Sequence, residues 1–263
     1  MNEKIHFVSG YLNYLLKSKH WKGHGIHSPF VYEFISQVLY DQKLYPEYEE
    51  IQTIRDKLKN ITERLPVSEL GAGSHEFSGE FRSVKDMAGQ SSVSHKFGKL
   101  LFRMAGFYKS PAIIELGTSI GLSTLYLAKG APDSRIVTLE GNKAVCDYAR
   151  SLFQEHRLKN VQAVNGLFDD YLTYLDEKYP DAGLVFIDGN HTREATLRYY
   201  HHFANGMKEG FIVIDDINWS ADMQEAWETI KSESSNRVTL DLFFMGIVIF
   251  RESITPGHYV VRF

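Results

Sequence analysis

Beyond residue 110 the chain alternates short apolar runs with longer segments in which apolar residues recur every three or four positions. The short runs have the length and composition of buried strands, and the longer segments have the period of amphipathic helices. Five strands are predicted here, at 112–116, 136–140, 161–165, 184–188 and 211–215. Each is followed by a predicted helix, at 122–129, 142–157, 168–178, 192–208 and 220–232. Such alternation predicts a mostly parallel sheet covered on both faces.

The alternation stops after residue 232. Two further strands are predicted at 238–245 and 247–251, joined near Gly246, with no room for a helix between them. Strands joined so closely must be antiparallel. The tail from 252 to 263 could add one more edge strand. The predicted fold class is therefore α/β: a Rossmann-like, doubly wound, mostly parallel sheet of seven strands that ends in an antiparallel hairpin.

The first 65 residues are predicted to form three helices. The first, at 5–17, places five apolar residues on one face: Val8, Tyr11, Leu12, Leu15 and Leu16. The second begins at Ser28 and Pro29, a helix cap followed by proline. The third, at 47–65, carries a narrow apolar seam: Ile51, Ile54, Leu58, Ile61 and Leu65. We predict a helical appendage at 1–65, a loop or linker at 66–90 and the main domain at 91–263, which opens with a helix at 91–108.

Composition and charge narrow the class of protein. The 263 residues are 43% hydrophobic and 24% charged, as in an ordinary globular protein, and the net charge of −4 argues against an extended nucleic-acid surface. The single cysteine, Cys146, suits a reducing compartment. No apolar run approaches the ~18 residues that cross a bilayer, and the N-terminus lacks the plan of a signal peptide. We expect a cytoplasmic enzyme with neither nucleic acid nor membrane as a partner.

The first predicted strand of the main domain leads into a glycine turn. Glu115 ends the strand, Gly117 and Gly121 bound the turn, and a helix begins at Leu122. Strand, glycine turn and helix N-terminus together form a cradle for a ligand. A dinucleotide-binding turn has the spacing G-x-G-x-x-G, whereas this one reads acid-x-Gly-x-x-x-Gly.

This turn resembles the first motif of the class I S-adenosylmethionine (SAM)-dependent methyltransferases, whose cofactor carries an amino acid and a ribose but no phosphate. A carboxylate at the end of the second strand, here Glu140, can accept bonds from the ribose hydroxyls of SAM or of NAD. The resemblance implies that SAM is bound by the first three strand ends. The residues expected there are Glu115, Gly117, Thr118, Ser119, Gly121, Ser123, Glu140 and the adenine-contacting segment Gly166, Leu167 and Phe168. Thr118, Ser119 and Ser123 could equally cap the helix.

Acidic residues also end the next two strands, in the segments LVFIDGNH at 184–191 and FIVIDDINW at 211–219. If these strands are neighbours, Asp188, Asp215 and Asp216 converge beside the methyl-donor pocket, so Asp188 is counted with the cofactor residues too. Three carboxylates suit a hard cation such as Mg²⁺, Ca²⁺ or Mn²⁺. The region from about 91 to 251 is similar to the catechol-type and caffeoyl-coenzyme-A-type O-methyltransferases, which bind a divalent metal at these positions.

The sequence departs from that family pattern at two positions. Asp216 stands where the catechol type usually has asparagine, and His191 stands where those enzymes often carry a lysine base. Histidine can act as a base near neutral pH. The form D-G-N-H also resembles a broader branch of SAM-dependent methyltransferases. In the alternative interpretation, Asp188 and Asp215 only cap the strand-to-helix turns, and His191 only forms a local hydrogen bond.

These patterns together predict a SAM-dependent methyltransferase that acts on a small-molecule acceptor at a hydroxyl oxygen, with His191 and Asp188 as catalytic residues. Either His191 or a metal at the three aspartates would deprotonate the hydroxyl. The alternatives are a metal-free N-methyltransferase and a SAM-binding interaction module without catalysis, which would form a homodimer through the seam at 51–65. The glycine spacing and the terminal hairpin oppose a dehydrogenase. The N-terminal loop with His20, Trp21, His24 and His27, or the helix from Ser91, could be a lid over the acceptor.

Overall fold

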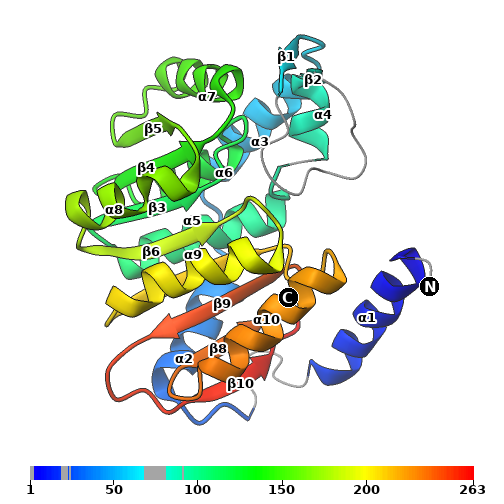
Figure 1. Ribbon diagram of the computed structural model, residues 1–263, viewed down its shortest axis with the longest axis vertical. Coiled ribbons are helices and arrows are strands. Elements are labelled where there is room, and N and C mark those ends of the chain that lie inside the picture. The colour runs from blue at the N-terminus through cyan, green and yellow to red at the C-terminus, as the bar shows by residue number, and fades with distance from the viewer. Residues whose placement is uncertain (1–2, 19–22, 24, 68–80, 91) are drawn as a thin grey trace. The chain divides into compact units, whose positions relative to one another are not determined.

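The computed structural model describes residues 3–18, 23, 25–67, 81–90 and 92–263. The chain divides into two compact units, Gln42–Leu184, and Met1–Asp41 together with Val185–Phe263, and Figure 1 labels most of their elements. Strand β6 (Ala182–Ile187) spans the boundary in sequence, so that its two halves belong to different units. His20, Trp21 and His24 of the predicted lid, and Ser91, lie outside the described residues.

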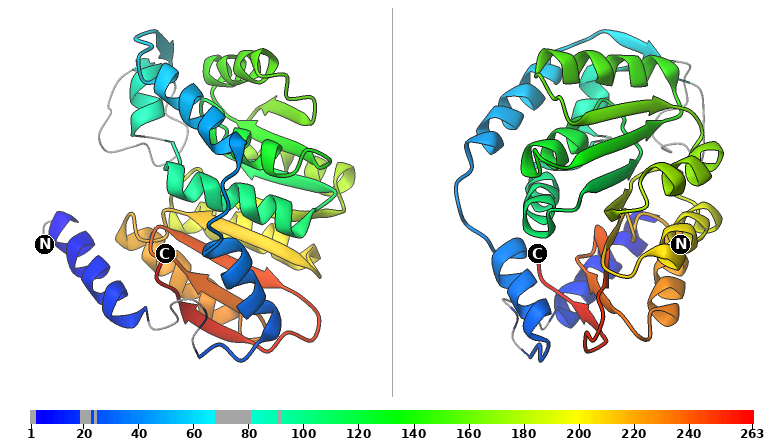
Figure 2. Two further views of the ribbon diagram at one scale, coloured as in Figure 1. Left: turned by 180° about the vertical axis from the view of Figure 1, so that it is seen from behind. Right: turned by 90° about the vertical axis from the view of Figure 1, so that its left-hand side faces the viewer.

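The unit 42–184 contains the predicted alternation of strands and helices. Strands β3 (Ala112–Leu116), β4 (Arg135–Glu140) and β5 (Val161–Asn165) are parallel, with β4 in the middle (Figure 2). The strand order here is β6-β3-β4-β5. All five residues of β3 are buried, as expected of a central parallel strand. The predicted bounds of β3 and β5 are confirmed.

Helices connect these strands and precede them. They are α5 (His95–Tyr108), α6 (Leu122–Gly130), α7 (Lys143–Glu155) and α8 (Phe168–Lys178). Helix α5 packs closely on α6 because Gly98 has no side chain. A Cβ at Gly98 would lie 2.2 Å from Cε2 of Tyr126, closer than atoms can approach. The predicted helix at 168–178 is confirmed.

The region before α5 differs from its prediction in both its helices and its strands. Helix α3 (Pro46–Leu58) ends before residue 65, because residues 64–66 form β1 (Arg64–Pro66), which pairs antiparallel with β2 (Phe81–Ser83). Strand β2 leads into α4 (Val84–Gly89). The expectation of a loop throughout 66–90 was therefore wrong for residues 81–89. Backbone pairing with a distant strand decided this, and local composition does not reveal it.

The other unit contains the antiparallel end of the sheet. Its strands lie in the order β10-β8-β9-β7-β6, and its remaining elements are α9 (Arg193–Gly206), β7 (Gly210–Asp215), α10 (Ala221–Glu233), β8 (Val238–Asp241), β9 (Met245–Phe250) and β10 (Gly257–Val260). Strand β9 runs antiparallel to both β7 and β8, which confirms the terminal hairpin. Strand β10 pairs parallel with β8 as the predicted further edge strand, so this sheet has one strand more than the seven expected.

The hairpin turn lies at residues 242–244 and not at Gly246. Gly246 is the second residue of β9, and a Cβ there would lie 2.8 Å from the ring of Trp227 on α10. The glycine therefore makes room for a tryptophan instead of forming a turn. Figure 1 shows α9 and α10 beside each other, which agrees with their packing contacts.

The N-terminal helices of this unit are α1 (Glu3–Lys17) and α2 (Pro29–Phe34), and α2 continues as a π-helical turn, Ile35–Leu39. Ser28 caps α2 as predicted, accepting a bond from the backbone N–H of Val31. Most of the predicted apolar face of α1 is not buried, because three of its four aliphatic residues, Val8, Leu12 and Leu16, are exposed. Instead, Tyr14 anchors the helix by donating its hydroxyl hydrogen to the carbonyl of Val261. No helix among the described residues is both long and apolar enough to span a membrane.

Candidate functional site

The glycine turn after β3 forms most of its hydrogen bonds within itself and with β4. The backbone N–H groups of Gly117 and Thr118 both donate to the carbonyl of Leu139, and that of Gly121 donates to the carbonyl of Thr118. Ser119 has a positive φ of 48° and donates its N–H to Oε2 of Glu140 at 2.8 Å. Four N–H groups of the turn are therefore already bonded within the protein. A pyrophosphate needs such groups as its donors.

The carboxylate of Glu140 connects two turns. Besides the bond from Ser119, its Oε1 accepts the backbone N–H of Asn142 at 2.9 Å, and Asn142 caps α7. Glu140 is half-buried, and burial raises the pKa of its carboxyl while the two backbone bonds lower it. A carboxylate oxygen has more than one lone pair, so both oxygens retain acceptor capacity. The side chain is thus held rigidly and can still accept two hydroxyl groups.

Glu115 was expected to contact the ligand, but it lies deep inside the protein. It is fully buried, and its Oε2 accepts bonds from the hydroxyls of Thr124 on α6 and Thr138 on β4. The hydroxyl of Thr138 is in turn bonded to that of Thr118 in the turn, at 2.6 Å. Burial raises the pKa of Glu115 to about 7, against the bonds from Thr124, Thr138 and Ser123 that lower it. The acid therefore ties β3, β4, the turn and α6 together from inside.

Two of the predicted site glycines make room for protein rings. Gly121 has a φ of 90°, and a Cβ there would lie 2.5 Å from the ring of Phe153 on α7. A Cβ at Gly166 would lie 2.1 Å from the ring of Tyr171 on α8. Leu167 after it is exposed, whereas Ser123 is buried at the start of α6. The predicted close approach of adenine to Gly166 stays a prediction.

Asp188, Asp215, Asp216 and His191 lie at the carboxyl ends of β6 and β7, in the unit that contains residues 185–263. Oδ1 of Asp188 is 3.6 Å from Nε2 of His191, an electrostatic contact slightly longer than a hydrogen bond. Asp216 has a φ of 56°, in the left-handed region that few non-glycine residues adopt. Such backbone conformations concentrate at functional sites. All four side chains are half-buried, so a ligand could reach them.

The charges of this group act on one another. Burial lowers the pKa of His191, and the carboxylate of Asp216 partly opposes the shift. Burial and the neighbouring carboxylates of Asp188 and Asp216 raise the pKa of Asp215 well above its usual value. Burial also raises the pKa of Asp216, against the effect of His191. The imidazole is thus neutral at pH 7 and able to accept a proton.

The predicted divalent cation can be compared with this geometry. The three carboxylates are the donors that Mg²⁺, Ca²⁺ and Mn²⁺ prefer, and Asp188 and Asp216 are close enough to Asp215 to raise its pKa. In the described part of the chain, however, no three histidine, cysteine, aspartate or glutamate side chains come together as a metal-binding group. The arrangement as it stands does not fit a bound cation. The metal stays a prediction, and no step below depends on it.

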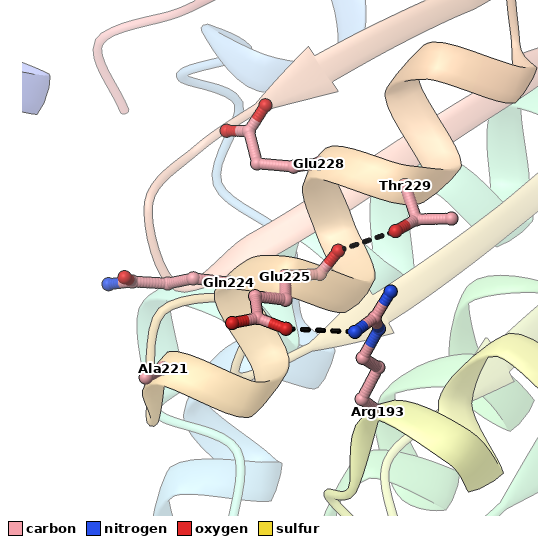
Figure 3. A pocket seen from close by; sticks show the side chains of 6 residues that line it. All are labelled: Arg193, Ala221, Gln224, Glu225, Glu228 and Thr229. Carbon is pink, nitrogen blue, oxygen red and sulfur yellow. Dashed lines mark hydrogen bonds and ion pairs between the residues drawn. The ribbon is translucent and has the colours of Figure 1, made fainter.

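A shallow hollow of about 440 Å³ lies elsewhere in this unit, between the start of α9 and one face of α10. It is lined by Arg193, Ala221, Gln224, Glu225, Glu228 and Thr229 (Figure 3). Arg193 forms an ion pair with Glu225 at 2.9 Å across it, and both side chains are exposed. No predicted site residue lines this hollow. An exposed ion pair of this kind contributes little to stability. Because none of the predicted site residues lies in the hollow, we do not include it in the candidate site.

Sequence reasoning missed four residues that organise the site: Thr124, Thr138, Asn142 and Asn165. Asn165 donates its side-chain amide to the carbonyls of Glu140 and Gly141, which joins the ends of β4 and β5. Asn142 could have been found, because asparagine before a predicted helix is a common cap. The two threonines have no such local signal, since they meet Glu115 only after the strands are paired.

Residues 114–217 match a family described as "Methyltransferase domain". A catechol O-methyltransferase of Mycobacterium tuberculosis is 33% identical over 127 residues, which are 48% of this chain and 56% of that enzyme. The match therefore spans little more than half of the relative's length.

Solved structures resemble the chain over a greater length. One is the O-methyltransferase of Bacillus cereus in complex with S-adenosylhomocysteine (SAH), with a TM-score of 0.54, 22% identity and coverage of 84% of this chain and 97% of the other. Another is the O-methyltransferase TomG of Streptomyces achromogenes in complex with SAM, with a TM-score of 0.56, 18% identity and coverage of 84% and 95%. At these identities the likeness shows a shared fold.

Proposed function

We propose that the chain is a class I SAM-dependent methyltransferase that transfers a methyl group to a hydroxyl oxygen of a small molecule, which the match of residues 114–217 to a methyltransferase domain supports. The relative from M. tuberculosis is a catechol O-methyltransferase, and we extend its acceptor, an aromatic diol, to this chain. The assignment of the cofactor rests on the hydrogen bonds of the turn after β3.

The turn favours a nucleoside without phosphates. Its backbone N–H groups at Gly117, Thr118, Ser119 and Gly121 are bonded within the protein, so they are poor candidates for binding a pyrophosphate. Glu140, in contrast, is fixed by two backbone bonds and can still accept both hydroxyls of a ribose. These residues fit SAM better than NAD. When bound, SAM supplies a methyl group already activated on a sulfonium.

The proton chemistry is assigned to the ends of β6 and β7. The neutral imidazole of His191 accepts the proton of the acceptor hydroxyl as the oxygen–methyl bond forms and the sulfur–methyl bond breaks. Asp188, at 3.6 Å from Nε2, stabilises the imidazolium that results. The oxygen becomes a methyl ether, and the cofactor leaves as SAH. General-base catalysis of this kind contributes roughly 10²–10⁴-fold to the rate.

The test is methyl transfer from SAM by the full chain to catechol, with 1,2-diaminobenzene as the matched nitrogen acceptor. We expect mass spectrometry to find O-methylated catechol together with an equal amount of SAH. Methylation of the diamine and not of the diol would contradict the proposal and favour an N-methyltransferase. Binding of SAH without turnover of any acceptor would contradict the assignment as an enzyme.

A further inference from the structure

The helices α3, α5 and α6 of the unit 42–184, labelled in Figure 1, are joined by one buried tyrosine. Tyr126 lies on α6, and its ring packs over Gly98 of α5, which leaves no space for a side chain there. Its hydroxyl lies 2.5 Å from Nδ1 of His95, the first residue of α5. The guanidinium of Arg55 on α3 acts on the same hydroxyl through its charge and a hydrogen bond.

The chemistry of these side chains fixes the direction of their hydrogen bonds. A guanidinium can only donate, so the oxygen of Tyr126 is the acceptor for Arg55. Burial raises the pKa of Tyr126 to about 12, against the effect of Arg55, so the hydroxyl keeps its hydrogen. That hydrogen is then available for Nδ1 of His95. Nδ1 can accept it only while the imidazole is neutral and carries its own hydrogen on Nε2.

Protonation of His95 would break this arrangement. Nδ1 would then carry a hydrogen of its own, and three donors would meet at one oxygen. The charges around the imidazole add to the conflict, because Lys99 on its own helix and Arg55 on α3 are both positive. Helix α3 also brings the carboxylate of Asp56 and the ring of Tyr48. Burial and the two cations lower the pKa of His95, against the smaller effect of Asp56.

Arg55 extends the cluster to the segment that leads into α5. Its side chain is almost fully buried, and it donates to the carbonyl of Ala88 at 3.2 Å and to that of Val93. The guanidinium that faces Tyr126 therefore also holds the connection between α4 and α5. A second positive charge on His95 would repel this guanidinium, so protonation acts on three helices at once.

Tyr126 holds one side of the helix that follows the glycine turn. Helix α6 begins at Leu122, directly after Gly121 of the turn. Thr124 holds another side of it by donating to Oε2 of Glu115. Residues two apart lie about 200° apart around a helix, so Thr124 and Tyr126 fix α6 from opposite faces. The start of α6, where the cofactor is proposed to bind, keeps its position only while both contacts are formed.

We propose that Tyr126 is a positioning residue for the cofactor helix α6 and holds that helix only while His95 is neutral, so that acidification weakens cofactor binding. This inference rests on the proposed function, because it takes the start of α6 as the cofactor site. It is separate from the proton transfer assigned to His191, which acts on the acceptor. Coupling of this kind between two parts of a protein commonly changes an affinity by about 5–150-fold.

The experiment measures SAH affinity of the full chain by calorimetry between pH 7.5 and pH 5. The wild type should lose about 10-fold in affinity as the pH falls, through a midpoint below 6.5, the ordinary value for histidine. His95→Asn keeps an acceptor at the δ position that does not titrate, so it should bind SAH nearly equally at both pH values. Tyr126→Phe should bind SAH about 10-fold more weakly at pH 7.5 and lose little more at pH 5.

Two variants of the same unit are matched controls. Tyr174→Phe removes the hydroxyl of an exposed tyrosine on α8, and His156→Asn removes the histidine that ends α7. Both should reproduce the wild-type dependence on pH. Equal SAH affinity of the wild type at both pH values would overturn the proposal, as would a loss on acidification that persists in His95→Asn. The predicted dependence without methyl transfer to any acceptor would overturn the reaction and leave this inference standing.

A second readout needs no ligand and so separates the inference from the cofactor assignment. Amide hydrogen exchange of residues 122–130 is compared between the wild type and His95→Asn at the same pH. We expect faster exchange in the wild type at pH 5 and equal exchange at pH 7.5. Equal exchange at pH 5 would overturn the inference, whether or not the chain binds SAH. In turnover assays with saturating SAM, the weaker cofactor binding has no effect, so the pH dependence of the rate reports on His191.

Discussion

The polar groups of the turn after β3 bond to one another, whereas the acids and the histidine at the ends of β6 and β7 are coupled through their charges. In the turn, Glu140 and Glu115 each accept two hydrogen bonds from neighbouring elements. At the other strand ends, His191 and Asp188 are 3.6 Å apart, and three acids share a half-buried region. The acids of the turn are thus fixed by directed hydrogen bonds, whereas His191 and Asp216 shift each other's pKa through their charges.

The two regions suit two different functions, cofactor binding and acid–base chemistry. A cofactor that is the same in every turnover is best bound by a rigid, prearranged set of groups, since no energy is then spent on ordering them. Acid–base chemistry requires groups whose protonation changes, and such groups have perturbed pKa values at functional sites. This contrast supports the proposal that the turn binds the cofactor and that the ends of β6 and β7 carry out proton transfer, and four experiments test it.

The largest effect is expected for His191→Ala. Removing the base should lower kcat by roughly 10²–10⁴-fold while SAH affinity stays within about 2-fold, because the turn is unchanged. Since burial lowers the pKa of His191, the neutral form already dominates near pH 7. Wild-type kcat/KM should rise with pH to a plateau through a midpoint below 6.5, the ordinary value for histidine, and this limb should vanish in the variant. A midpoint above 6.5, or an unchanged profile in the variant, would exclude His191 as the base.

Glu140→Ala tests the turn in the same way. The change removes a charged acceptor for two ribose hydroxyls, so SAH affinity measured by calorimetry should fall by about 100-fold, from two charged hydrogen bonds at about 1.5 kcal/mol each. Glu177→Ala, an exposed glutamate on α8, is the control and should bind SAH normally. Normal SAH binding by Glu140→Ala would remove the basis for locating the cofactor at this turn.

Glu115 offers a test of stability. Its pKa is about 7 in the folded chain and near 4.5 when unfolded, so the folded state holds the proton more tightly. Protonated Glu115 contributes fully to the free energy of unfolding below pH 4.5, and this contribution declines as the pH rises to about 7. Above that pH the chain is about 3 kcal/mol less stable than at low pH. Glu115→Gln should therefore be more stable than the wild type in urea at pH 8, by up to about 3 kcal/mol, and nearly equal at pH 4.5. A difference that is the same at both pH values would show that Glu115 is ionised throughout.

The smallest effect is expected for chelation. No step of the proposed reaction depends on a cation, because His191 accepts the proton, so EDTA should change the rate of methyl transfer by less than about 2-fold. Asp215→Asn measured with and without Mg²⁺ is the companion experiment. A loss of activity in EDTA that Mg²⁺ restores in the wild type but not in Asp215→Asn would establish the predicted cation at the three aspartates.

The sequence was sufficient for elements whose pattern is local. The apolar runs at 112–116 and 161–165 and the amphipathic segment at 168–178 formed as predicted, because a fully buried strand and a regular helix are encoded in their own residues. The expected order of strands and helices and the terminal antiparallel pair were also predicted correctly.

The remaining features depend on contacts between distant residues. Helix α1 is anchored by Tyr14 on Val261, so its aliphatic stripe is exposed, although the pattern alone suggested a buried face. Gly246 suggested a turn but accommodates Trp227. At the site, strand ends identified the acids, while the threonines that bond to Glu115 become apparent only after the strands are paired.

The central claim is that a phosphate-free nucleoside cofactor binds where β3 meets α6. Titration of the full chain by calorimetry with SAH and, separately, with NAD tests it directly. We predict saturable binding of SAH at a single site and no measurable binding of NAD at the same concentrations. Binding of NAD without binding of SAH would contradict the account.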